Sequence, residues 1–316
     1  MKAIVTGGAG FIGSHVVDRL ISDGYSVSVI DNMTGGYFEN LDQYKNNDRV
    51  KIYNTDIRDT EALNKIFVGH DVVFHLAAQA NIRKSAIDHK SDLDNNLVGT
   101  INILEAMLKN KITDLVFAST SALYGEAIVR PTPETYMGIQ TSLYGASKLA
   151  CEAYAEAFIG FAPINFWAFR FSNIIGERCR RGVTWDFVQK LITNPSELEI
   201  LGDGKQSKEY LYVKDCVNGI MTGYQKSHER VNIFNLAIEE NSVVDEIADI
   251  IIQELQLKNV KRKYSGGPRG WIGDNPLVHL SIDKIKSLGW KPQVSSKQAI
   301  TLTAQWSIDE TRKKTK

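Results

Sequence analysis

The chain has few cysteines and no long apolar run, and both shortages narrow the class of protein. Its three cysteines, Cys151, Cys179 and Cys216, lie far apart and form no Cys-x-x-Cys pair. This usage is typical of reduced thiols and argues against a disulfide framework or a zinc site. No run of about 18 apolar residues occurs, so no transmembrane helix is predicted. A charged segment followed by a short apolar run is also missing at the start, and we therefore expect a cytoplasmic protein.

The chain also lacks an excess of charge of either sign. Lys and Arg together number 37, as do Asp and Glu, so the formal net charge is +0 at pH 7. Without a global field, neither a nucleic acid nor a membrane is predicted as a partner. We interpret the polar tail, residues 309–316, as a frayed terminus rather than a nucleic-acid arm. Hydrophobic residues make up 43% of the chain, enough for one large domain and a smaller one.

Glycines occupy the junction between the first apolar run and the first helical pattern. Gly7, Gly10 and Gly13 follow the apolar residues that end at Thr6. There, Gly7 permits a tight turn, Gly10 lets the backbone approach a pyrophosphate, and Gly13 lets the helix pack closely on the strand. The helix N-terminus then faces the phosphates. The pattern alone also fits βα turns that bind no ligand.

Polar and small residues follow the next apolar runs, where a dinucleotide would need them. Asp31 ends the second run with Asn32, and a carboxylate there accepts hydrogen bonds from ribose hydroxyls and repels a 2′-phosphate. NAD is therefore favoured over NADP, although an Asp-Asn pair also forms turns. Asp56 could reach the adenine amino group, and Ile57 could pack on the ring. We interpret His75, which opens His75-Leu-Ala-Ala-Gln79, as a core histidine.

Tyr144 and Lys148 stand one helical turn apart after the fifth apolar run, on one face of the predicted helix. A phenol has a pKa of about 10, and lowering it to about 7 requires roughly 4 kcal/mol of preferential stabilisation of the phenolate. Lys148 and a nicotinamide cation are suitable sources of this stabilisation, because both carry positive charge. Thr120, between Ser119 and Ser121, ends the fifth run and could hydrogen-bond the oxygen that Tyr144 deprotonates. A Tyr and a Lys at this spacing also occur by chance on many helices.

Strand-like and helix-like patterns alternate along the first part of the chain. Strands are predicted at 3–6, 26–31, 50–56, 71–78, 114–120 and 165–170, and helices at 14–22, 60–67, 96–109 and 144–158. This order predicts an α/β fold with a doubly wound parallel sheet. Beyond Arg170 the alternation breaks down: we predict helices at 184–192 and 243–255 and short strands at 198–201 and 233–236.

Together these motifs resemble the extended short-chain dehydrogenase/reductases, in particular the NAD-dependent nucleotide-sugar epimerases and dehydratases typified by UDP-glucose 4-epimerase. The resemblance runs from Lys2 to about Pro292. Further matching motifs are Asn96-Leu-Val-Gly-Thr100, Ser119-Thr-Ser-Ala-Leu-Tyr-Gly125, Arg170-Phe-Ser-Asn173, Gly202-Asp-Gly204, Tyr212-Val-Lys-Asp215 and Leu288-Gly-Trp-Lys-Pro292. The resemblance implies a Rossmann domain over residues 1–172, rejoined at about 210–237. A smaller interleaved C-terminal substrate lobe is expected over 173–209 and 238–316.

The family's chemistry implies that Tyr144 takes a proton from a sugar hydroxyl, usually at C4, while hydride passes to NAD and leaves a 4-keto sugar. Residues implied to bind NAD are Gly7, Gly10, Phe11, Ile12, Gly13, Asp31, Asn32, Asp56, Ile57, Leu76, Ala77, Ala78, Gln79, Asn96, Ser119, Tyr144, Lys148 and Phe171. Ser121 and Asn173 are expected near the nucleotide-diphosphate sugar. A homodimer through the helices of Asn96 and Tyr144 is implied as well.

Departures from the family pattern bear on the substrate. Members that dehydrate or decarboxylate carry an acidic residue where this chain has Ser121 and Ala122, which argues against both reactions. Lys208 stands where an Arg commonly grips the diphosphate, and Lys is only a point charge. Arg269 is a candidate second contact, in a glycine-rich loop (266–274) that resembles a branch linked with activated heptoses in surface-polysaccharide synthesis. Both cations could instead be ordinary surface charge.

Two outcomes share every residue named so far. A 4-epimerase returns the hydride to the other face of the keto sugar, whereas a 4-dehydrogenase of a GDP-heptose type releases the keto product. Family frequency favours the epimerase. A third hypothesis is an NAD-binding regulator without catalysis, and the presence of Thr120, Tyr144 and Lys148 argues against it.

Overall fold

The computed structural model describes residues 1–267, 270 and 277–314. A seven-stranded sheet in the order β10-β6-β5-β4-β1-β2-β3 forms its centre, and every neighbouring pair is parallel. The strands are β1 (Lys2–Thr6), β2 (Ser26–Asp31), β3 (Val50–Asn54), β4 (Val72–His75), β5 (Asp114–Thr120), β6 (Asn165–Phe171) and β10 (Val231–Leu236). The predicted doubly wound α/β sheet is thus confirmed, with its switch point between β1 and β4.

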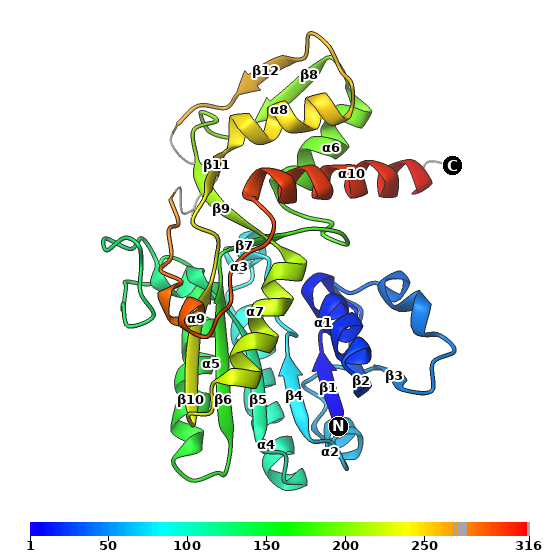
Figure 1. Cartoon of the computed structure of the whole chain (residues 1–316), viewed down its shortest axis with the longest axis vertical. Helices are drawn as coiled ribbons and strands as arrows, with labels where there is room; N and C mark the ends of the chain where they lie inside the picture. The colour runs from blue at the N-terminus through cyan, green and yellow to red at the C-terminus, as the bar shows by residue number, and fades with distance from the viewer. Residues whose placement is uncertain (268–269, 271–276, 315–316) are drawn as a thin grey trace.

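Helices cover both faces of this sheet (Figure 1). They are α1 (Phe11–Ser22), α2 (Thr60–Ile66), α4 (Gly99–Asn110), α5 (Leu143–Ile159) and α7 (Val213–Lys226). The short helix α3 (Ile82–Ser85) packs on α5. Ala3 and Val5 of β1 pack in the core with α1 and α7, whereas Ile4 packs in the core with α2, α4 and α5. This alternation follows from the period of two along a strand, so an apolar run without polar breaks is what a sheet covered on both sides requires.

Three short turns of other helical types complete this part of the chain. Two are 3₁₀ helices, Phe38–Tyr44 and Ser121–Tyr124, and one is a π-helical turn, Leu93–Val98, which leads directly into α4. Each lies near a predicted cofactor or substrate residue.

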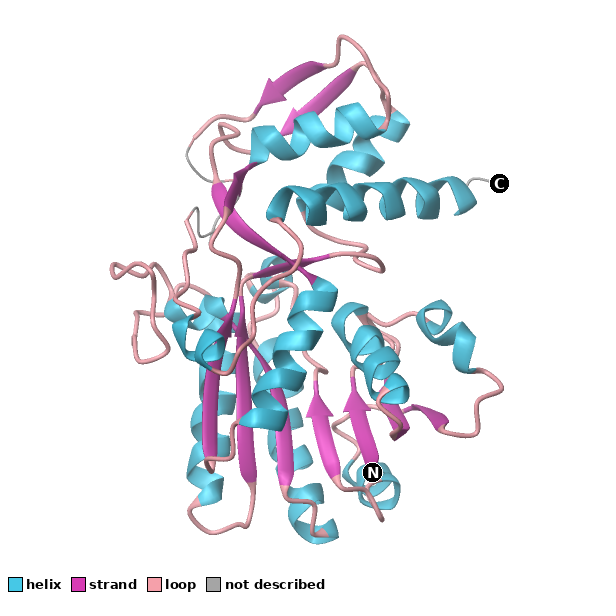
Figure 2. Cartoon of the chain, viewed as in Figure 1, coloured by secondary structure: helices cyan, strands magenta, loops and turns pink. Residues whose placement is uncertain are grey.

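A small lobe stands over the carboxyl ends of the main strands, whose arrowheads point toward it in Figure 2. It contains the sheet β11-β9-β7 and the parallel pair β12-β8. Its elements are β7 (Asn173–Ile175), α6 (Val183–Thr193), β8 (Glu197–Ile200), β9 (Ser207–Tyr212), β11 (Asn241–Val243), α8 (Val244–Glu254), β12 (Lys261–Tyr264) and α10 (Ser296–Lys314). Helices α6, α8 and α10 enclose a separate core that includes Phe187, Ile251 and Ile300. Helix α9 (Asp283–Ser287) lies beside β10.

Most predicted elements differ from the observed ones only at their ends, but α7 and α10 were not expected. The interpretation of residues 309–316 as a frayed terminus was wrong as far as Lys314, because α10 extends to that residue. Ile308 is 5% exposed, and Glu310 forms an ion pair with Arg180; these contacts hold the last turns in place.

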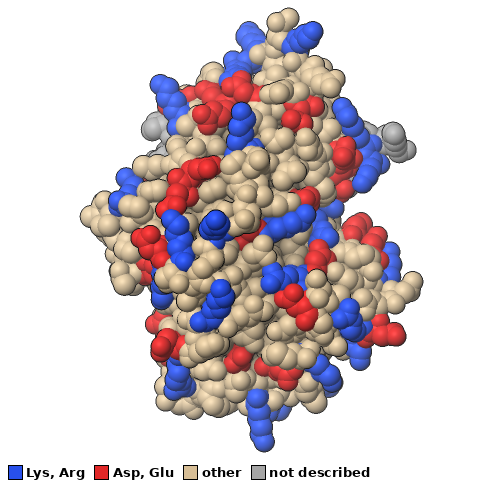
Figure 3. All heavy atoms as spheres, viewed as in Figure 1, with Lys and Arg blue, Asp and Glu red and all other residues tan. Residues whose placement is uncertain are grey.

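The surface and the thiols agree with the composition. Figure 3 shows basic and acidic side chains interspersed over the visible face, without a patch of one sign. Cys151, Cys179 and Cys216 are all buried and unpaired with one another. Within the described residues, no helix has the combined length and apolar character of a membrane span.

Candidate active site

The glycine turn lies between β1 and α1, and close packing explains its sequence. Gly7 has φ +68°, and a Cβ there would lie 2.7 Å from the backbone nitrogen of Ala77. A Cβ on Gly13 would lie 2.0 Å from the Gly7 carbonyl oxygen. Helix α1 begins at Phe11 after Gly10, which has no side chain to cover the N-terminus. These are the features that a dinucleotide pyrophosphate needs, so the turn fits NAD.

Asp31 lies at the end of β2 beside this turn. Its carboxylate accepts hydrogen bonds from the N–H groups of Ala9 (3.0 Å) and Met33 (2.9 Å). Burial raises the pKa of Asp31, and these backbone donors oppose the rise. Nearby, the Asn32 amide donates to Asp56 at 2.9 Å, and hydrogen bonds from Arg58 hold the pKa of Asp56 below its usual value.

His75 is a core residue, as interpreted, and it is 1% exposed. The Thr100 hydroxyl donates its proton to the Asn96 carbonyl at 2.6 Å, so His75 Nε2 is the donor in the 3.1 Å bond with Thr100. In a neutral ring Nδ1 then accepts from the Thr6 hydroxyl at 2.6 Å, and that hydroxyl accepts from the Ala77 N–H at 3.2 Å. The partners thus assign a neutral imidazole protonated at Nε2. Burial lowers the pKa of His75 to about 3, which agrees with that assignment.

The hydrogen bonds from His75 through Thr100 lead to Asn96, which contacts the turn after β4 near the predicted cofactor site. The Asn96 side chain accepts from the Gln79 N–H at 2.7 Å and donates to the Gln79 carbonyl at 3.1 Å. It also donates to Ser147, next to Lys148 on α5, at 2.9 Å. Asn96, whose role the sequence left to the family resemblance, therefore joins the turn after β4 to α5.

Thr120 is the last residue of β5, and Tyr144 lies in the first turn of α5. Hydrogen bonding by Thr120 lowers the pKa of the Tyr144 phenol. Gly145 lets α5 pack closely on the turn after β5, because a Cβ on this residue would lie 2.5 Å from the Ala122 carbonyl oxygen. Lys148 lies one turn further along α5, 2% exposed, with its ammonium 3.8 Å from the centre of the Phe117 ring.

The electrostatics of the pair are set by burial. Burial raises the pKa of Tyr144, while the positive charge of Arg181 and the hydrogen bond with Thr120 lower it. Burial lowers the pKa of Lys148 to about 8. A phenolate at Tyr144 therefore needs nearby cations. Arg181, which the sequence reasoning missed, is one of them; no local pattern marks it, because it reaches the site from the segment after β7.

The predicted substrate residues lie on neighbouring strands above this edge. Asn173 of β7 pairs in register with Tyr210 of β9, and its side chain donates to the Glu209 carbonyl at 3.2 Å. Lys208 is half-buried on the same strand. Ser121 begins the 3₁₀ turn after β5, and Phe171 of β6 pairs in register with Thr120. Arg269 lies outside the described residues.

A buried ionic network supports the site from below. Arg170 Nη2 lies 2.6 Å from Glu152 Oε2, and Ser119 donates to the same carboxylate. Arg170 Nη1 donates to the Tyr124 hydroxyl at 2.9 Å and to the Glu134 carbonyl at 2.6 Å. The sequence analysis did not predict this network, but an Arg between Phe169 and Phe171 in an apolar strand is a signal that could have indicated it.

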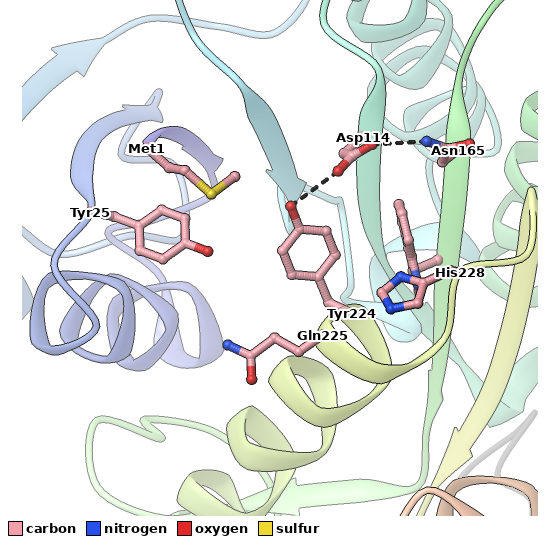
Figure 4. A pocket seen from close by; sticks show the side chains of 8 residues that line it. Met1, Tyr25, Asp114, Asn165, Tyr224, Gln225 and His228 are labelled. Carbon is pink, nitrogen blue, oxygen red and sulfur yellow. Dashed lines mark hydrogen bonds between the residues drawn. The ribbon is translucent and has the colours of Figure 1, made fainter.

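A hollow of about 350 Å³ lies at the opposite edge of the sheet, between Tyr25, Tyr224 and the starts of β5 and β6 (Figure 4). Asp114 accepts there from Tyr224 (3.1 Å) and Asn165 (3.1 Å). Ligands of doubly wound sheets bind at the carboxyl ends of the strands, so this hollow is not the cofactor or sugar site.

A family model described as the NAD dependent epimerase/dehydratase family matches residues 3–237. The chain belongs to this family. It is therefore an NAD-dependent enzyme with the short-chain dehydrogenase/reductase type of fold. A protein of Methanocaldococcus jannaschii, provisionally named UDP-glucose 4-epimerase, is 37% identical over 315 residues, 98% of this chain and 99% of that protein.

Solved structures of this family are also similar over their full length. UDP-glucose 4-epimerase from Thermotoga maritima, solved with UDP-glucose, has a TM-score of 0.88 and 34% identity and covers 100% of both chains. UDP-glucose 4-epimerase from Thermus thermophilus, solved with NAD, has a TM-score of 0.85 and 29% identity, covering 97% of this chain and 99% of that one.

Proposed function

We propose that this protein is a 4-epimerase of a UDP-hexose that works through a 4-keto intermediate. The observation that carries the proposal is that Tyr144 and Lys148 lie one helical turn apart on α5, while Thr120 ends β5 and lowers the pKa of the Tyr144 phenol by hydrogen bonding. Ser121 and Ala122 supply no acidic group for elimination or decarboxylation of a keto sugar. Similar proteins of the same length are named as UDP-glucose 4-epimerases, which supports the same substrate class.

In this proposal Tyr144 accepts the proton of the C4 hydroxyl and later returns it to the C4 oxygen. Thr120 orients the two oxygens, and general-base help of this kind contributes about 10²–10⁴-fold to a rate. Lys148 and Arg181 favour the phenolate by charge. NAD, which the glycine turn and Asp31 would hold, would supply the hydride acceptor for C4 and the donor for the opposite face of the keto sugar. The reaction involves no net gain or loss of atoms or electrons, because the product differs from the substrate only in configuration at C4.

The diphosphate sugar is expected against Asn173, Lys208 and Ser121, with Arg269 as a further candidate contact. Asn173 and Lys208 lie close because β7 and β9 are hydrogen-bonded neighbours. A single ammonium grips a diphosphate less specifically than a guanidinium does, so we expect Lys208 to hold the diphosphate less firmly than an Arg would. Activated heptoses and net 4-dehydrogenation stay predictions from the sequence.

The experiment is to incubate the NAD-loaded protein with UDP-glucose, UDP-galactose, UDP-N-acetylglucosamine and a GDP-heptose, and to identify products by mass and NMR. An epimer of unchanged mass is expected from a UDP-hexose. A product that has lost two hydrogens would show a dehydrogenase instead. Tyr144→Phe should lower turnover about 10²–10⁴-fold and keep NAD bound; unchanged turnover would contradict the role of Tyr144.

We also propose that the enzyme is a homodimer through α4 and α5. Leu108 on α4 and Tyr154 on α5 are 43% and 50% exposed, and Leu143 and Phe161 add further exposed apolar surface at the two ends of α5. Tyr154→Lys together with Leu108→Lys should convert a dimer to a monomer in analytical ultracentrifugation. A parent protein that sediments as a monomer would refute the proposal.

A further inference from the structure

The segment Glu177–Arg180, here called the strap, connects β7 to α6 and crosses to the cofactor side of the molecule. His15 of α1 donates from Nε2 to the Glu177 carbonyl at 3.0 Å. Arg178 Nη1 lies 2.8 Å from Asp18 Oδ2, also on α1. The strap therefore packs directly on the helix that follows the glycine turn.

Arg180 extends these contacts to two further elements. Its Nη1 donates to the Asn40 side-chain oxygen at 3.0 Å, and its Nε and Nη2 donate to Glu310 Oε1 of α10 at 3.1 and 2.7 Å. The guanidinium also lies 4.3 Å from the centre of the Tyr37 ring. With only 8% of its side chain exposed, Arg180 joins residues 37–44, the strap and α10 at a single buried point.

Residues 37–44 in turn hold the glycine turn. The Asn40 side chain, 3% exposed, donates to the Ala9 carbonyl at 2.8 Å. The Tyr37 N–H donates to the same oxygen at 3.0 Å. The Ala9 N–H donates to Asp31 at 3.0 Å. One residue, Asn40, thus lies between the Arg180 guanidinium and the turn that fits the NAD pyrophosphate.

We propose that Arg180 is a positioning residue that slows the release of NAD by fixing residues 37–44 to α10. Loops with few buried contacts open locally at low free energy, and Tyr37 and Phe38 are 40% and 50% exposed. The charge-assisted bonds of Arg180 keep this loop against the glycine turn and Asp31. The inference rests on the proposed function, because an epimerase must keep its cofactor between the two hydride transfers.

The test measures NAD release from the NAD-loaded protein without any sugar, by exchange against excess labelled NAD. Arg180→Gln and Glu310→Gln should each release NAD about tenfold faster or more, and Arg180→Lys should fall between them and the parent. The double variant should release NAD no faster than Arg180→Gln, because both changes break the same contact. The matched control is Arg262→Gln, which loses ion pairs to Asp245 and Asp249 within the small lobe and should leave release unchanged.

Release at the parent rate in Arg180→Gln and Glu310→Gln would overturn the proposal, even if both variants melted at lower temperature. Faster release in the Arg262→Gln control to the same extent would overturn it too, because the effect would then be one of general stability. Since no sugar is present, these outcomes do not depend on which nucleotide sugar the enzyme converts. A failure to epimerise UDP-hexoses would refute the proposed function alone.

Discussion

Replacing Glu152 by Gln should destabilise the protein strongly, because Glu152 is the carboxylate that faces a buried guanidinium. The side chains of Arg170 and Glu152 are 4% and 2% exposed, and their closest N–O distance is 2.6 Å. Arg170 Nε lies 3.2 Å from each oxygen of the same carboxylate. Removing one partner of a buried pair costs about 3–5 kcal/mol, because the remaining charge stays desolvated. We expect a loss of this size in Glu152→Gln.

The assay is thermal and urea unfolding of the parent and its variants. At roughly 2–4 °C per kcal/mol for a large domain, Glu152→Gln should lower Tm by at least about 6 °C. The control, Glu239→Gln, breaks an exposed pair with Lys286 (2.7 Å) and should change stability by less than about 1 kcal/mol. Glu152→Met combined with Arg170→Met should recover most of the loss. A single variant as stable as the control, or a double variant less stable than Glu152→Gln, would refute the reasoning.

Three further predictions concern the site. Burial lowers the pKa of Lys148 to about 8, so between that pH and about 10.4 the unfolded chain binds more protons and stability rises with pH. NAD-free Lys148→Met should therefore melt above the parent at pH 7, by a margin that shrinks between about pH 8 and 10; a constant margin would contradict this. Burial lowers the pKa of His75 to about 3, so stability should fall as the pH drops below about 6.5, and His75→Leu should flatten that slope in urea midpoints; parallel slopes would count against it. A Cβ at Gly145 would lie 2.5 Å from the Ala122 oxygen, so Gly145→Ala should lower kcat roughly 10²-fold by moving Tyr144 from Thr120. Gly160→Ala at the C-terminal cap of the same helix, where a Cβ would lie 3.1 Å from its nearest atom, should keep the parent kcat, and equal rates in the two variants would be evidence against this geometry.

The sheet and the tight packing of the glycine turn could be predicted because their signals are local. Gly7 and Gly13 stand at a strand-to-helix junction, and each has a steric reason that the structure shows. Asp31 ends its strand, and Tyr144 and Lys148 differ by one helical turn. Each of these patterns spans only a few residues, so it could be recognised from the spacing of its residues in the sequence.

The small lobe and the ionic contacts could not be read in the same way. The end of α10 is rich in charged residues and looks like a solvated tail, yet Ile308 is buried against the small lobe and Glu310 meets Arg180. The electrostatic effect of Arg181 on Tyr144 likewise joins segments far apart in the chain. Such pairs depend on how β7 leaves the sheet, and no periodicity encodes that path. The residues expected to bind the substrate could therefore be proposed only from the family resemblance.

The position of β10 has a consequence for biosynthesis. β10 is the edge partner of β6, but the ribosome must first make the chain from Ser172 to Arg230, which includes much of the small lobe. At about 5–20 residues per second, the apolar β6 strand, with Phe166 and Phe169, spends several seconds without its partner. A chain released within this interval would expose an unpaired apolar strand edge, the kind that templates association between chains. The interval before Val231 emerges is therefore the stage at which we expect this enzyme to depend most on chaperones.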